Sequence, residues 1–266
     1  MASKLSANGY VTSSDSKLYY EVEGNSDGPT ILFIHGLGGT TNAYQPIVPD
    51  LQDYNIVRFD WGGHGRSSTP KTTSIESYVA DAEAVLNELK LSNVYVVGHS
   101  LGGLVALHFA AKLSDKVKAL VLFGPISPPP EAGQQGLKGR AAAVREKGMA
   151  GIADTVVGNA FAAESYKSRR GEVALAREML TRQDPEGYAL ACEAAANSTP
   201  PAFDQIKAKV VVVSGKEDKV STVQAGETTT QKLGSNAKQE VFEGVGHWHM
   251  LEATEKAIEI IKATFS

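Results

Sequence analysis

The sequence predicts an α/β protein with a mostly parallel sheet, flanked by helices and interrupted by an inserted helical cap. Apolar, β-branched runs alternate with helix-like segments through much of the chain, which is typical of a doubly wound sheet. A Pro/Gly-rich stretch at 124–136 then leads into Ala-rich, helix-favouring sequence. That insert, about 65 residues long, exceeds an ordinary connection. The 266 residues are enough for one such domain.

The strand-like runs begin with a predicted hairpin, because residues 9–13 and 17–24 flank the turn at Asp15-Ser16. Six further runs are rich in β-branched residues or end on turn residues, and they span 30–36, 54–60, 93–99, 117–124, 209–215 and 238–244. The first five of these are apolar throughout, which favours strands buried on both faces of a sheet.

Helical periodicity is clearest at 74–90, where apolar residues recur on one face and Ser74 is a candidate N-cap, with Ser77 or Glu76 close behind. Placing the insert over the carboxyl ends of the strands gives two predicted units. The core comprises residues 1–124 and 206–266, and the cap or lid comprises residues 125–205.

Composition excludes several classes of function. The net charge of −4 and the lack of a dense Lys/Arg stripe predict no nucleic-acid partner. A single cysteine, Cys192, excludes an intramolecular disulfide framework. The first residues lack an apolar leader and no apolar run is long enough to span a bilayer, so we expect a cytoplasmic protein with no membrane partner, monomeric or homodimeric.

A candidate nucleophile lies where a predicted strand becomes a predicted helix, in Gly98-His99-Ser100-Leu101-Gly102. The pattern G-x-S-x-G in that context is a nucleophile elbow, whose glycines permit a strained backbone and a close strand–helix crossing. The alternative is a plain turn before a tightly packed helix. A serine nucleophile also needs a base, an orienting acid and oxyanion donors, so the rest of the chain decides between the two.

The remaining parts of such a site are all present in the expected order of serine, acid and base. His247 follows a glycine after the last strand and is the predicted base, with His249 as the alternative. Asp218, in the loop after the strand at 209–215, is the predicted acid, with Glu217 as the alternative.

The predicted oxyanion donors are backbone N–H groups, one from Leu101 and one from Leu37 in the glycine-rich loop after the strand at 30–36. The segment FDWGGHGRSS at 59–68 is interpreted as scaffold that braces the site. No metal-ligand spacing and no nucleotide-binding glycine motif occurs, so no cofactor and no metal are expected.

Five stretches in order, FIHGLGG, FDWGGHGRS, VVGHSLGG, SGKEDKV and GVGHWHMLE, resemble the motifs of the α/β-hydrolase fold. The resemblance implies that fold and a triad of Ser100, Asp218 and His247. Within the insert, residues 140–161 and 179–197 resemble the cap of 3-oxoadipate enol-lactonases. The chain departs from that family where the substrate would bind, with His35-Gly36 in place of Asn-Ser and Leu137 near the usual position of a Trp. The predicted substrate-binding residues are His35, Gly36, Leu137, Arg140 and Trp248.

The sequence therefore predicts a cofactor-independent serine hydrolase that cleaves a lactone or small carboxylic ester through an acyl-enzyme. Two alternatives remain open: hydrolysis of a carbon–carbon bond in a diketone by the same triad, and a slow-turnover lactone receptor with the same fold. Arg140 and Arg145 are the candidate cationic partners for a substrate carboxylate, or else surface residues. The loss of the Trp favours a neutral substrate.

Overall fold

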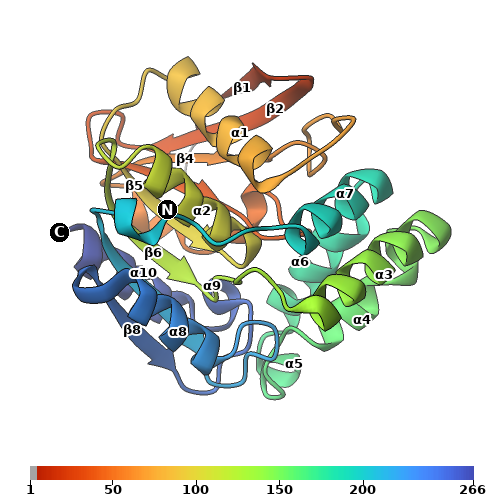
Figure 1. The fold of residues 1–266 in the computed structure, drawn as a ribbon. Coiled ribbons are helices and arrows are strands. Elements are labelled where there is room, and N and C mark those ends of the chain that lie inside the picture. The colour runs from red at the N-terminus through yellow and green to blue at the C-terminus, as the bar shows by residue number, and fades with distance from the viewer. Residues whose placement is uncertain (1–4) are drawn as a thin grey trace.

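The computed structural model describes residues 5–266 and has an eight-stranded sheet of order β1-β2-β4-β3-β5-β6-β7-β8 (Figure 1). The pairs β1–β2 and β2–β4 are antiparallel, and all the other pairs are parallel. The strands are β1 Leu5–Ser13, β2 Ser16–Gly24, β3 Thr30–Ile34, β4 Asn55–Phe59, β5 Val94–His99, β6 Val117–Phe123, β7 Lys209–Gly215 and β8 Ala237–Phe242. The predicted hairpin and the mostly parallel sheet are thus confirmed.

Helices cover both faces of this sheet. One buried apolar cluster joins α1 (Ile75–Glu88), α2 (Leu101–Lys112) and α8 (Val223–Leu233) to one face, and a second cluster joins α10 (Thr254–Phe265) to the other. Helix α1 begins as predicted, because the side chains of Ser74 and Ser77 form a reciprocal capping box. Short 3-10 turns occur at Thr41–Tyr44, Val48–Leu51, Met149–Gly151, Phe203–Gln205 and Gly234–Asn236.

A group of helices separates β6 from β7 and lies together at the right of Figure 1. Its members are α3 Glu131–Lys147, α4 Ala153–Gly158, α5 Ser165–Ser168, α6 Arg170–Thr181 and α7 Pro185–Ala196. We call residues 125–205 the cap, with the boundaries that the sequence predicts. The division into core and cap stays a prediction, and residues 1–4 of the predicted core lie outside the described residues.

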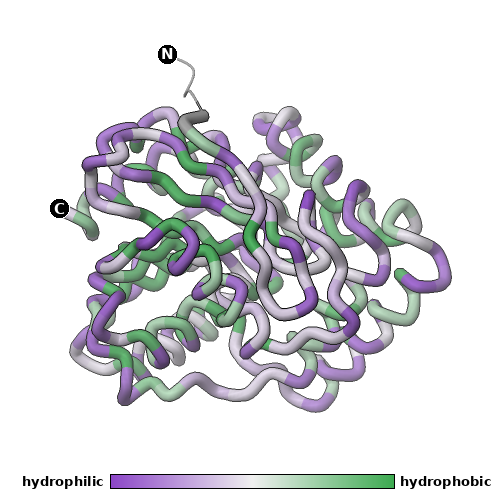
Figure 2. The backbone as a smooth tube through the Cα atoms, turned by 90° about the horizontal axis from the view of Figure 1, so that it is seen from above, coloured by the Kyte–Doolittle hydropathy of each residue, from purple (hydrophilic) through white to green (hydrophobic). Residues whose placement is uncertain are grey.

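Hydropathy follows the layers of the fold. The central strands carry the hydrophobic colour in Figure 2, and the outer turns of the helices are largely hydrophilic. Among the helices of residues 5–266, none combines the length and the apolar character needed to cross a membrane. The parallel strands all end at one edge of the sheet, so the loops that follow β3, β5, β7 and β8 meet there.

Candidate active site

Ser100 occupies a strained turn between β5 and α2. Its backbone has φ 55° and ψ −120°, a left-handed conformation that a residue with a side chain rarely adopts. The turn is closely packed, because a Cβ on Gly98 would lie 2.7 Å from the Gly102 carbonyl oxygen, and a Cβ on Gly102 would lie 2.2 Å from that of His35. Both glycines of the motif are therefore required sterically, and the strand–turn–helix context that the sequence predicts is present.

Two hydrogen bonds join His247 to the other predicted triad residues. His247 lies in the loop between β8 and α9 (His249–Glu252). Its Nε2 is 2.8 Å from Ser100 Oγ, and its Nδ1 is 2.8 Å from Asp218 Oδ2. All three residues are buried. The structure therefore brings Ser100, His247 and Asp218 into one hydrogen-bonded line.

The ionisation of Asp218 determines the tautomer of His247. Burial opposes the charge, but His247 and the backbone N–H of Ser221 outweigh it and hold the pKa of Asp218 below its ordinary value. Asp218 Oδ1 accepts hydrogen bonds from the N–H groups of Val220 and Ser221 at 2.7 and 2.8 Å. An ionised carboxylate can only accept, so Nδ1 of His247 carries the proton and Nε2 is free to accept the proton of Ser100.

The two alternative residues have other partners. His249 is fully buried, and its Nδ1 donates to the His247 carbonyl oxygen at 2.9 Å. Glu217 accepts from the N–H of Ala163 in the cap at 3.2 Å. Neither side chain hydrogen-bonds to Ser100, whereas His247 does, so the geometry favours His247 and Asp218, whose catalytic roles remain predictions.

Two residues that the sequence does not mark as functional, His99 and Glu252, hold the His247 loop. His99 Nε2 donates to the His247 carbonyl oxygen at 2.8 Å. Glu252 accepts from the N–H groups on both sides of His247, those of Gly246 and Trp248, at 3.1 and 3.0 Å. The available signal for Glu252 was an acidic residue in the short helix directly after the loop, where backbone N–H groups lack partners.

A cavity of about 530 Å³ opens beside Ser100. Both residues of the predicted oxyanion hole line it, as do three of the predicted substrate-binding residues, Leu137, Arg140 and Trp248. The other two do not line it. The ring of His35 is buried, 4.4 Å from the ring of Trp61, and a Cβ on Gly36 would lie 2.9 Å from the Ser100 Cβ.

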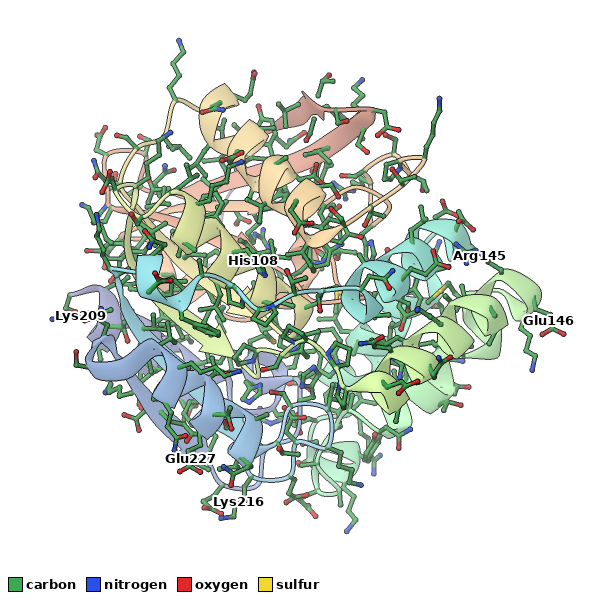
Figure 3. All side chains as sticks on the ribbon, in the orientation of Figure 1. His108, Arg145, Glu146, Lys209, Lys216 and Glu227 are labelled. Carbon is green, nitrogen blue, oxygen red and sulfur yellow. The ribbon has the colours of Figure 1, made fainter. Side chains whose placement is uncertain are left out.

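The cavity wall is mostly apolar. Arg140 is the one Lys or Arg side chain among the described residues that line it. Arg145, the other candidate cation, instead pairs with Glu186 and Glu193 at the seam between α3 and α7, on the outer side of the cap (Figure 3). The two arginines therefore lie on different surfaces of the cap, and only Arg140 can contact a molecule bound in the cavity.

The chain is similar to known α/β hydrolases in both sequence and structure. Residues 29–149 match the family model of the alpha/beta hydrolase fold. The chain is 28% identical to 3-oxoadipate enol-lactonase 2 of Acinetobacter baylyi over 96% of this chain and 97% of that relative. The solved enol-lactonase of Burkholderia xenovorans LB400 matches with a TM-score of 0.89 and 25% identity, over 97% of this chain and 99% of that one. A thermophilic esterase of Thermogutta terrifontis shares the fold, with a TM-score of 0.89 and 22% identity over 97% of both chains.

Four buried histidines surround the site in neutral form. Burial lowers the pKa values of His35 and His249 to about 4. It also lowers those of His64 and His99 well below the ordinary value. The rings of His35, His99 and His249 each make one hydrogen bond, and the second nitrogen of each has no partner among residues 5–266. A neutral imidazole satisfies this arrangement, whereas a charged one would place an uncompensated charge in the core.

Two buried carboxyl groups have the opposite shift. Burial raises the pKa values of Asp60 and Asp81 to about 6. Each remains hydrogen-bonded to backbone N–H groups, Asp60 to those of Thr41 and Arg66 and Asp81 to that of Gly62. On acidification these carboxyls bind protons in the folded state before they do so in the unfolded chain.

We predict that acidification from pH 7 to pH 5 destabilises the protein. Unfolded histidines take up protons near pH 6.5, which the four buried ones do not, whereas the two carboxyls are protonated earlier when folded. On unfolding, the four histidines gain about four protons and the two carboxyls lose about two, so the net uptake is about two protons. Each proton taken up lowers the free energy of unfolding by about 1.4 kcal/mol for each pH unit of acidification. Urea unfolding at pH 7, 6 and 5 measures the slope. A free energy of unfolding that stays level or rises toward pH 5 would contradict the assignment of these histidines as neutral.

Proposed function

We propose that this carboxylic ester hydrolase of the α/β-hydrolase fold opens a lactone or cleaves a small ester by serine chemistry without a cofactor. The observation that carries this proposal is the hydrogen-bonded line from Ser100 through His247 to Asp218 at the wall of an apolar cavity. The similarity to proteins named enol-lactonases, over nearly the whole chain, supports a lactone as substrate.

The proposed reaction has two halves. Ser100 Oγ attacks the substrate carbonyl while His247 Nε2 takes its proton, and Asp218 stabilises the imidazolium that forms. The N–H groups of Leu37 and Leu101 would stabilise the oxyanion of the tetrahedral intermediate. His247 then protonates the leaving alcohol, which in a lactone stays attached to the acyl chain. Water, activated by the same histidine, releases the acid and restores Ser100.

The cavity supports a neutral substrate more than an anionic one. A carboxylate that enters an apolar site must lose water and gain a cationic partner of fixed geometry. The cavity offers Arg140 alone, and its side chain is exposed to solvent. A solvated guanidinium gives little net compensation for a desolvated carboxylate. Apolar residues such as Leu137 and Ile152 make up much of the remaining wall.

We predict that Ser100→Ala and His247→Ala each lower kcat by several orders of magnitude while the fold survives, because the triad acts as a unit. The measurement is steady-state hydrolysis of a panel of lactones, simple esters and a diketone, with circular dichroism as the check on folding.

His249→Ala is the matched control, since it removes an adjacent imidazole that has no contact with Ser100. We expect a much smaller loss of kcat than in His247→Ala, because the His249 ring is buried and does not line the cavity. Full activity of Ser100→Ala would end the serine mechanism, and a larger loss of kcat in His249→Ala than in His247→Ala would move the base to His249. A single fast turnover followed by none would indicate a receptor, and cleavage of the diketone alone would indicate carbon–carbon bond hydrolysis.

We further predict that a neutral lactone is a better substrate than its matched analogue with a side-chain carboxylate. The comparison is kcat/KM for the pair, in the native protein and in Arg140→Ala. A preference for the acid by tenfold or more, about 1.4 kcal/mol of transition-state stabilisation, that disappears in Arg140→Ala would refute the neutral-substrate proposal. Arg145→Ala, which leaves the cavity intact, is the control for a general effect of positive charge.

A further inference from the structure

The loop that carries the Leu37 amide forms a tight turn from Gly36 to Gly39. The Gly39 N–H donates to the Gly36 carbonyl oxygen at 2.9 Å, and Gly38 has a φ of 76°. A closed turn with positive φ at its third residue is of type II, which differs from type I by about a half-turn rotation of the central peptide. The peptide between Leu37 and Gly38 carries the Gly38 N–H, so a partner for that N–H holds the type II form, and with it the neighbouring peptide that carries the Leu37 N–H.

His64 is one such partner. Its Nε2 accepts a hydrogen bond from the Gly38 N–H at 3.1 Å, and its ring is buried. His64 belongs to the glycine-rich segment after β4, which the proposed reaction does not use. Because Nε2 must accept, the ring has to be neutral, and its burial keeps it so.

Gln183, between α6 and α7, holds the same turn from the side of the cap. Its Nε2 donates to the carbonyl oxygens of Gly38 and Gly39 at 3.0 and 3.1 Å, and its Oε1 accepts from the Gly65 N–H at 3.0 Å. The side chain is 4% exposed. One buried amide thus joins the turn to the segment that carries His64.

Close packing leaves this contact little freedom. A Cβ on Gly38 would lie 2.3 Å from Leu180 Cδ2, and a Cβ on Gly187 would lie 2.0 Å from the Gly63 carbonyl oxygen. The corner between α6 and α7 therefore rests directly on the backbone of both loops. Gln183 Nε2 also donates to the Met179 carbonyl oxygen of α6 at 3.1 Å. A buried amide in such a setting is costly to leave unpaired, so its four partners are held in place.

We propose that Gln183, with His64, positions the oxyanion hole: the two side chains fix the turn at Gly38 so that the Leu37 N–H faces the carbonyl under attack. Both are positioning residues and touch no substrate. The cap then has a part in the chemical step as well as in covering the cavity. This inference rests on the proposed function, because it concerns the oxyanion of that reaction.

The test is Gln183→Leu, which keeps similar bulk and removes the amide. We expect kcat for a 4-nitrophenyl ester to fall about 10- to 100-fold. This decrease is smaller than, or comparable to, the decrease in kcat that follows removal of one oxyanion donor. KM should change by less than about threefold, since an oxyanion donor acts on the transition state and hardly on the bound substrate. The inhibition constant of a trifluoromethyl ketone, which forms a tetrahedral adduct with a serine, should rise by the same factor as kcat falls.

Thr69→Val is the matched control. Thr69 Oγ1 bonds to Asp184, the residue next to Gln183, so this variant breaks a neighbouring bond between the cap and the core without touching the turn. We expect its kcat and its inhibition constant to match those of the native protein. A loss equal to that of Gln183→Leu would mean that docking of the cap in general matters and would overturn the specific role of Gln183.

A second pair of variants addresses the other partner and carries the test if Gln183→Leu does not fold. His64→Phe keeps a ring and removes the acceptor, so it should show the same loss of kcat, and His64→Gln, whose carbonyl oxygen can accept, should recover part of it.

Amide hydrogen exchange of the peptide at 35–45 should be faster in Gln183→Leu and unchanged in Thr69→Val, independent of activity. Unaltered amide exchange and unaltered kcat in folded Gln183→Leu would overturn this inference. The proposed function would still stand in that case, provided that Ser100→Ala is inactive.

Discussion

The hydrogen bond between His247 Nδ1 and Asp218 Oδ2 is the interaction on which the candidate site depends. It places the proton of the imidazole on the side away from Ser100, so that the other nitrogen can accept. Each partner follows a different parallel strand, and the sheet alone brings those strand ends together. The fold thus brings the two loops together, and the buried carboxylate of Asp218 determines which nitrogen of His247 can accept the proton of Ser100.

The loops of this edge are held mainly through their backbone. Glu252 bonds to the N–H groups on both sides of His247, and the same carboxylate bonds to the N–H of Ala162 and the hydroxyl of Ser165 in the cap. Gln183 makes the corresponding contact with the turn at Gly38. Because buried backbone groups need partners, the cap contributes hydrogen-bond partners to the loops as well as part of the cavity wall.

Local patterns in the sequence predict the strands, the helix caps and the turn that carries Ser100. The capping box at Ser74 and the strained turn at Ser100 each lie within a few residues, and both are present in the structure, whereas the catalytic roles of Ser100, Asp218 and His247 stay predictions. The roles of Gln183 and His99 could not be predicted in this way, because their partners lie 145 and 148 residues away in sequence. Whether His35 contacts substrate depends on how deeply the loop after β3 is buried, which local sequence does not reveal. In the structure the His35 ring is buried and does not line the cavity.

The residue that becomes acylated can be located by covalent labelling. A fluorophosphonate reacts with a serine that is activated by a neighbouring base, and its adduct persists because it resembles the tetrahedral intermediate. Peptide mapping by mass spectrometry should find one adduct per chain, on the peptide that contains Ser100, with protection by excess ester substrate. A label on any other residue, or none on a protein that still hydrolyses esters, would contradict the central claim that Ser100 is the nucleophile.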